Sequence, residues 1–105
     1  MNTVIHVKVA NTFMKKLRGL MFKKECTYNL LLENCRAIHT FGMLFPIDCI
    51  CIDKDNIIIA TIKNINPCRI VIAPPRTKSI IECKTNKHAD TLFKNGLHVD
   101  IYKDI

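Results

Sequence analysis

The sequence predicts a mainly β protein, a compact single-domain β-barrel or sandwich with one or two short α-helices. Apolar and polar residues alternate with period two in several separate segments, which is typical of strands that bury one face. Apolar residues recur at helical spacing in only two short segments. The 105 residues are 49% hydrophobic and 24% charged, which is enough apolar material for one core without disulfide or metal staples. We therefore expect residues 1–105 to form a single domain.

The first expected elements are a strand and a short helix. TVIHVKVA at residues 3–10 alternates as a strand does, with His6 facing away from the core. The segment NTFMKKLRGLMFKKE, residues 11–25, places apolar side chains at helical spacing while its basic side chains point elsewhere. Asn11 or Thr12 is available as the N-cap, so the sequence predicts a short basic amphipathic helix.

The clearest β-hairpin is predicted in IDCICIDKDNIIIATIKNI, residues 47–65. Two β-branched runs flank a short polar turn, in which Asp55 or Asn56 can take the left-handed backbone conformation. The prolines in NPCRIVIAPPRTK, residues 66–78, predict an edge strand or an extended loop. The alternating pattern resumes in KSIIECK, residues 78–84, which predicts another strand.

The chain is expected to end with a helix and a strand. TNKHADTLFKNG, residues 85–96, has Thr85 or Asn86 as a possible N-cap and Gly96 at its end. LHVDIYK, residues 97–103, alternates again and predicts the last strand.

The cysteine spacing argues against a metal or redox site. No pair has the Cys-x-x-Cys spacing of a zinc ribbon or a thioredoxin-type motif. Residues two apart on a strand lie too far from each other for an unstrained disulfide, and buried free cysteine packs as a small hydrophobe. We therefore predict free thiols, no metal and no cofactor for the six cysteines, which are Cys26, Cys35, Cys49, Cys51, Cys68 and Cys83.

The net charge of +7 raises the question of an anionic partner. Five of the sixteen basic residues lie between Lys15 and Lys24, so the predicted helix carries a concentrated charge. This segment could contact nucleic acid or an anionic membrane surface. No Phe or Tyr alternates with its lysines as a base-stacking surface would require, so we favour a solvated basic face.

Five motifs in order carry a family resemblance. The chain resembles the bacterial and archaeal family called domain of unknown function 192. The resemblance implies a compact, mainly β fold with one or two short helices and no assigned biochemical function. Many relatives carry an export signal, whereas this chain begins at its first expected strand, so we expect a cytoplasmic protein. The motifs are RGLMF at 18–22, HTFGMLFPID at 39–48, IDKDN at 52–56, KSIIE at 78–82 and NGLHVD at 95–100.

The candidate site residues are polar side chains within or near the second motif. His39, Thr40 and Asp48 interrupt an otherwise apolar stretch. A histidine beside a carboxylate is half of a catalytic arrangement, but the sequence contains no nucleophile motif, metal-ligand cluster or phosphate-binding glycine loop to complete it. We favour a structural interpretation, in which these side chains satisfy buried backbone groups. Arg69 and Glu82 are added from their expected fold positions, as a buried ion pair with the same cluster.

Three functional hypotheses follow from these observations. We favour a non-enzymatic binding or accessory module that presents the His39–Asp48 loop to a protein or a small ligand. The candidate ligand-binding residues are His39, Thr40, Asp48, Arg69 and Glu82, and none is assigned as catalytic. The first alternative is an enzyme with a His39 and Asp48 acid–base pair. The second is a weak binder of nucleic acid or an anionic surface through Lys15–Lys24. No transmembrane segment is expected.

Overall fold

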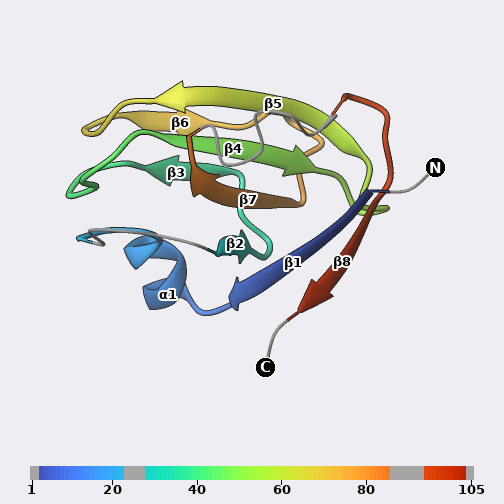
Figure 1. Cartoon of the computed structure of the whole chain (residues 1–105), viewed down its shortest axis with the longest axis horizontal. Helices are drawn as coiled ribbons and strands as arrows, with labels where there is room; N and C mark the ends of the chain where they lie inside the picture. Colours follow the sequence, from blue (N-terminus) through green and yellow to red (C-terminus); the bar gives the residue numbers. More distant parts are fainter. Residues whose placement is uncertain (1–2, 23–27, 86–93, 104–105) are drawn as a thin grey trace.

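The computed structural model describes residues 3–22, 28–85 and 94–103 (Figure 1). Within these residues the fold is mainly β with one short helix, as the sequence predicts. The elements are β1 (Thr3–Ala10), α1 (Phe13–Arg18), β2 (Asn29–Leu32), β3 (Ala37–His39), β4 (Ile47–Ile52), β5 (Ile58–Ile65), β6 (Ile70–Ile72), β7 (Ser79–Lys84) and β8 (Val99–Lys103).

The strands form a large mixed sheet and a small ribbon. The six-stranded sheet has the order β5-β4-β7-β2-β1-β8, and β3 and β6 form a separate antiparallel pair. Strand β1 runs parallel to both β2 and β8, while the other pairings are antiparallel. Over the described residues the sheet does not close, although a bridge between Ile57 and His98 joins its outer strands at one end. The sandwich alternative therefore fits the fold, and the barrel alternative does not.

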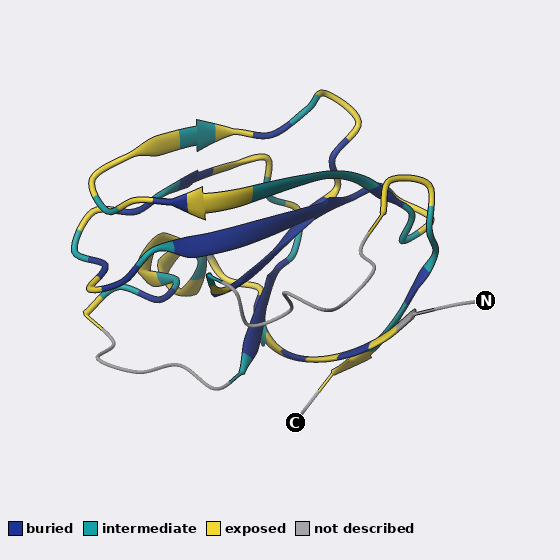
Figure 2. Cartoon of the chain, turned by 45° about the horizontal axis from the view of Figure 1, so that its top comes forward, coloured by how far each residue is buried: buried dark blue, intermediate teal, exposed yellow. Residues whose placement is uncertain are grey.

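Two apolar clusters form the core, one on each face of the sheet. Strand β4 is buried at all six positions, because both of its faces are covered. Figure 2 shows the buried residues running through the middle of the sheet, with exposed residues on the outer ribbon and turns. The first cluster includes Leu20, Leu30, Leu32, Ile38, Met43, Phe45, Ile47, Cys49, Cys51 and Ile80, and the second includes Ile5, Val7, Leu31, Ile50, Ile52, Ile58, Ile81 and Val99.

The cysteines of the central strands serve as core residues. Cys49, Cys51 and Cys83 are buried free thiols, and the first two belong to the same apolar cluster. Burial raises the pKa of the Cys49 thiol well above its usual range and also raises that of Cys51. Such thiols are poor nucleophiles, because the reactive thiolate is disfavoured.

Local sequence signals explain the hairpin and the helix. In the turn between β4 and β5, Asp53 Oδ1 accepts the N–H groups of Asp55 and Ile57 at 2.8 and 3.0 Å. Asn56 takes the left-handed conformation with φ 61°, so the predicted hairpin is confirmed. Helix α1 begins after Thr12, whose hydroxyl accepts the Lys15 N–H at 3.2 Å, as predicted for the N-cap.

The sequence predictions for β2, β6 and the second helix have different outcomes. The sequence analysis did not identify β2 as a separate strand, because its three successive leucines do not alternate with polar residues and all four positions of NLLL are buried. The edge position predicted within residues 66–78 is confirmed, since β3 is the one described strand that pairs with β6. The helix predicted at residues 85–96 lies mostly outside the described residues. No described helix combines the length and the apolar character needed to span a membrane.

Candidate functional site

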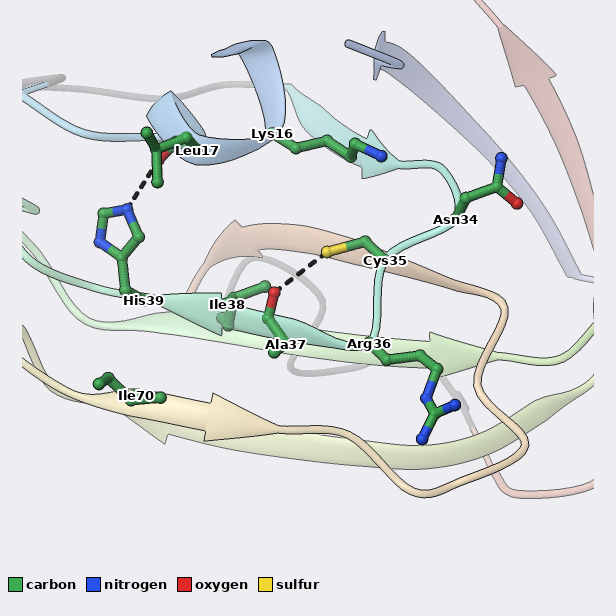
Figure 3. A pocket seen from close by; sticks show the side chains of 9 residues that line it. All are labelled: Lys16, Leu17, Asn34, Cys35, Arg36, Ala37, Ile38, His39 and Ile70. Carbon is green, nitrogen blue, oxygen red and sulfur yellow. Dashed lines mark hydrogen bonds between the residues drawn. The ribbon is translucent and has the colours of Figure 1, made fainter. Parts of the chain in front are cut away.

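A pocket of about 390 Å³ lies between α1, the segment leading into β3, and β6. Figure 3 shows Lys16 and Leu17 of α1 above the pocket, β3 across its middle and Ile70 of β6 below. Its lining is mostly apolar, with polar groups concentrated at the rim. The complete lining is Lys16, Leu17, Asn34, Cys35, Arg36, Ala37, Ile38, His39 and Ile70.

The charges at the rim of this pocket are positive. Lys16 Nζ donates to the Glu33 carbonyl oxygen at 3.1 Å, a neutral acceptor that leaves the ammonium charge uncompensated. Arg36 is exposed, and its guanidinium makes no hydrogen bond or ion pair with the residues that the structure describes. No Asp or Glu lines the pocket, so its rim attracts anionic groups.

His39 connects the pocket to α1. Its Nδ1 accepts the Phe41 N–H at 3.2 Å, so in the neutral ring the proton lies on Nε2. Nε2 then donates to the Leu17 carbonyl oxygen at 2.7 Å (Figure 3). This bond satisfies a carbonyl near the C-terminal end of α1, where helical acceptors lack partners. The imidazole is therefore held in one tautomer by backbone groups of two segments.

Thr40 is buried beside the pocket and forms hydrogen bonds with several backbone groups. Its side chain is 0% exposed, and its hydroxyl donates to the Asn66 carbonyl at 2.8 Å while accepting the Arg69 N–H at 2.7 Å. Its backbone N–H donates to the Arg69 carbonyl, and its carbonyl accepts the Cys68 N–H. These bonds extend the β3–β6 pairing through the turn before β6, where Cys68 has φ 66°.

Asp48 stabilises a bulge in the large sheet. Between Ile47 and Cys49 the pairing with β5 shifts register, and Asn64 at this point has a positive φ of 56°. The Asn64 N–H donates to Asp48 Oδ1 at 2.8 Å, and the Thr85 hydroxyl donates to the same oxygen. The carboxylate thus satisfies an amide that the bulge removes from the regular ladder, as the structural interpretation expected.

His39 and Asp48 do not form an acid–base pair. Successive side chains on a strand point to opposite faces, so Asp48 shares a face of β4 with Ile50, whereas Cys49 faces the cluster that contains Ile38 of β3. The two side chains make their hydrogen bonds in different places. The arrangement required by the enzyme alternative is therefore not assembled.

The ion pair suggested between Arg69 and Glu82 is also wrong. Arg69 is exposed, and its guanidinium has only long contacts of 3.5 and 3.4 Å with the Pro67 and Cys68 carbonyls. Glu82 is 1% exposed and points into the first apolar cluster on the same face of β7 as Ile80. Fold position alone does not specify which face of a strand meets which neighbour.

Glu82 places a carboxyl in the core, and one of its oxygens has no hydrogen-bond partner among the described residues. This oxygen is Oε1, and the register partners of Glu82 on the adjacent strands are Leu30 and Cys49. Burial raises the pKa of the Glu82 carboxyl to about 8, because the charged form loses its hydration. The side chain is therefore mainly neutral at pH 7.

The sequence analysis missed most of the pocket. Lys16, Cys35 and Arg36 come from segments whose juxtaposition depends on how α1 crosses β3. The sequence did contain one signal, which was a pair of large apolar residues on a proline-flanked edge strand. In the structure these residues, Ile70 and Ile72, are 69% and 76% exposed. Across the described residues, no cluster of three or more His, Cys, Asp or Glu side chains is arranged to hold a metal ion.

Comparison with family models decides the family. Residues 1–101 match the family model of domain of unknown function 192, described as an uncharacterised conserved region. The chain belongs to the DUF192 family. The UPF0127 protein PH1112 of Pyrococcus horikoshii supports this assignment with 38% identity over 81 residues, which cover 72% of this chain and 70% of that protein. The resemblance found in the sequence motifs is confirmed.

Two solved structures share the fold of this DUF192 domain. A protein of unknown function from Novosphingobium aromaticivorans has a TM-score of 0.77 and 19% identity, covering 86% of this chain and 70% of that one. A protein from Sinorhizobium meliloti, described as a candidate transcription regulator, has a TM-score of 0.78 and 16% identity, covering 86% and 76%. At these identities the likeness establishes the fold alone.

Replacing Asp48 tests its role at the bulge. Asp48→Ala should lower the free energy of unfolding by about 1 to 3 kcal/mol, because the Asn64 N–H is left without its acceptor. Asp48→Asn is the matched control, since its side-chain oxygen can still accept that N–H, and it should cost clearly less. Urea unfolding at pH 7 measures both. Equal midpoints and slopes for Asp48→Ala and the wild type would refute the structural role.

Ionisation of Glu82 should lower the free energy of unfolding as the pH rises. Its pKa is about 8 in the folded chain against 4.5 ordinarily, so between these values the folded state binds more protons than the unfolded state. Stability therefore falls as pH rises through this window and levels off above about 8.

The matched variant is Glu82→Gln, which cannot ionise. From pH 5 to pH 8 the wild type should lose up to about 4 kcal/mol more than this variant, at about 1.4 kcal/mol per pH unit. The slope is the readout, because the amide also changes the pH-independent part of the stability. Parallel pH profiles for the two proteins would show that Glu82 ionises normally in the folded state.

Proposed function

We propose that this DUF192 domain is a non-enzymatic binding module whose pocket beside His39 takes a small amphipathic organic anion. The supporting observation is the composition of the pocket: an apolar wall next to two cationic side chains, with no acidic residue in the lining. Such a ligand has an apolar body and a carboxylate or similar anionic group.

The apolar wall sets the size and character of the ligand body. Leu17, Ala37, Ile38 and Ile70 contribute this surface, and ligand sites are usually apolar clefts with a few placed polar groups. A volume of about 390 Å³ lies near the lower end of the usual range for such sites. A ligand with a single ring or a short chain therefore suits it.

The cations at the rim favour an anionic head group. Lys16 is held by a neutral carbonyl, and Arg36 can offer a forked pair of N–H donors to a carboxylate. In this arrangement His39 positions α1 over the pocket through its bond to Leu17. It contributes to binding by supporting the wall.

Binding fits these residues better than catalysis. Both ring nitrogens of His39 are engaged by backbone groups, so neither is directed at a substrate. The Cys35 thiol donates to the Ala37 carbonyl at 3.1 Å. Asp48 bonds to the bulge on another part of the sheet, so among the described residues of this pocket His39 has no carboxylate partner with which to activate a nucleophile.

Nucleic-acid binding through Lys15–Lys24 is less well supported. Lys16 lines the pocket beside His39, whereas Lys15 and Arg18 line a different cavity. The basic side chains of α1 are therefore divided between two concave sites and do not form one continuous face. We place the module in the cytoplasm, where buried and exposed thiols both stay reduced.

A pair of matched compounds tests the proposal. The 4-phenylbutyrate anion should bind with measurable affinity in an NMR titration that follows the Ile38 and Ile70 methyl groups. The neutral 4-phenylbutanamide should bind at least tenfold more weakly, which corresponds to about 1.4 kcal/mol. The double variant Lys16→Gln with Arg36→Gln should remove this preference for the anion.

Two controls make the titration specific. Lys63→Gln with Lys94→Gln removes two exposed charges elsewhere and should leave the preference unchanged. Ala37→Phe fills the pocket from an exposed position of β3 and should prevent binding of both compounds. Equal affinity for the acid and the amide, or binding that persists in Ala37→Phe, would contradict the proposal.

A further inference from the structure

A second, smaller cavity lies on the other side of α1, next to β1 and β2. It has a volume of about 210 Å³ and is lined in part by Lys8, Lys15, Arg18 and Tyr28. We propose that this cavity binds a small oxyanion of the phosphate or sulfate type, and that Glu82 behind its wall makes the binding dependent on pH. This proposal does not depend on the function proposed for the pocket beside His39.

The charges of this cavity favour an oxyanion. Lys15 and Arg18 extend from α1, and Lys8 extends from β1. Lys8 Nζ lies 4.4 Å from the centre of the Tyr28 ring, a contact that orients the lysine without neutralising it. Over the described residues none of these three cations makes an ion pair, and no Asp or Glu lines the cavity.

The size of this open cavity suits a small ion. A water molecule occupies about 30 Å³ in the liquid, so a volume of about 210 Å³ accommodates a tetrahedral oxyanion with part of its hydration. Lysine and arginine are the side chains that most often hold phosphate-like groups. The sequence analysis did not anticipate Tyr28 beside the cations, because it comes from a different segment.

Gly19 brings the buried carboxyl of Glu82 against the cavity wall. Gly19 lines the cavity and has φ 49°. A Cβ atom at this position would stand 2.9 Å from Glu82 Oε1, so the carboxyl oxygen packs against Gly19 and leaves no room there for a larger residue. Leu30, which also lines the cavity, is the register partner of Glu82. The buried carboxyl is therefore adjacent to two of the residues that line the cavity.

Ionisation of Glu82 changes the field in the cavity. When the carboxyl is neutral, the three cations act on the oxyanion without opposition. When it is charged, a buried negative charge repels the oxyanion at short range through a poorly polarisable medium. Burial raises the pKa of Glu82 to about 8, so this change falls between neutral and mildly alkaline pH.

Linkage makes the effect reciprocal. A bound oxyanion should raise the pKa of Glu82 further, by the same free energy by which ionised Glu82 weakens the oxyanion. Other titratable or charged groups also face this region, and their contribution has to be separated from that of Glu82. They are Lys8 on β1, Lys15 and Arg18 on α1, Tyr28 before β2, and Cys49 on β4.

The experiment titrates the full chain with sulfate, whose charge is constant between pH 6.5 and pH 9. NMR follows the Val9 and Leu30 methyl groups, which belong to lining residues, in reducing buffer with ionic strength held constant by chloride. For the wild type we expect a saturable response and an apparent Kd at least fivefold higher at pH 9 than at pH 6.5. For Glu82→Gln the two values should agree within twofold.

Charge variants locate the response. Lys15→Gln with Arg18→Gln should weaken sulfate binding at least tenfold at pH 6.5, while Lys63→Gln with Lys94→Gln, which removes two exposed charges outside both pockets, should leave it unchanged. A linear, non-saturating response would overturn the oxyanion site. The same pH dependence in Glu82→Gln and the wild type would overturn the coupling. An oligonucleotide that binds much more tightly than sulfate and requires Lys15 and Arg18 would replace the small-ion site with a nucleic-acid site.

Discussion

The buried hydroxyl of Thr40 holds the small β3–β6 ribbon together where its two strands leave their regular pairing. It bonds to the Asn66 carbonyl and the Arg69 N–H through two partly buried hydrogen bonds, so that both backbone groups have a protein partner. Strand β6 is thereby fixed against β3, and His39, next to Thr40, is placed where it reaches the Leu17 carbonyl. The pocket exists because this chain of contacts orders α1, β3 and β6 relative to one another.

Helix α1 separates two concave sites with different chemistry. Its Lys16 and Leu17 face the larger, apolar pocket, whereas Lys15 and Arg18 face the smaller cavity with Tyr28. Because α1 has only six residues, its orientation depends on its ends. Thr12 caps the first turn, and His39 binds a carbonyl of the last turn. A change at either end is therefore expected to affect both sites.

Local signals explain why part of the structure could be predicted from sequence. The turn at Asp53–Asn56, the Thr12 cap and the capping role of Asp48 depend on residues close in sequence or on a general need to satisfy buried amides. The pairing of β2 with β1 and β7 depends on long-range packing and has no alternating pattern to reveal it. The surroundings of Glu82 are likewise set by which strand faces meet, which is why the suggested ion pair with Arg69 failed. The position of Arg18 beside Lys8 depends on where α1 packs.

Native-state hydrogen exchange of the Thr40, Cys68 and Arg69 amides tests most directly whether this polar cluster ties the ribbon to the core. All three amides donate hydrogen bonds within the cluster. If the cluster and the large sheet unfold together, their opening free energies should agree within about 1 kcal/mol with those of the β4 and β7 amides. Opening free energies several kcal/mol lower, with the sheet still protected, would show that the ribbon opens independently and that Thr40 does not hold the site in place.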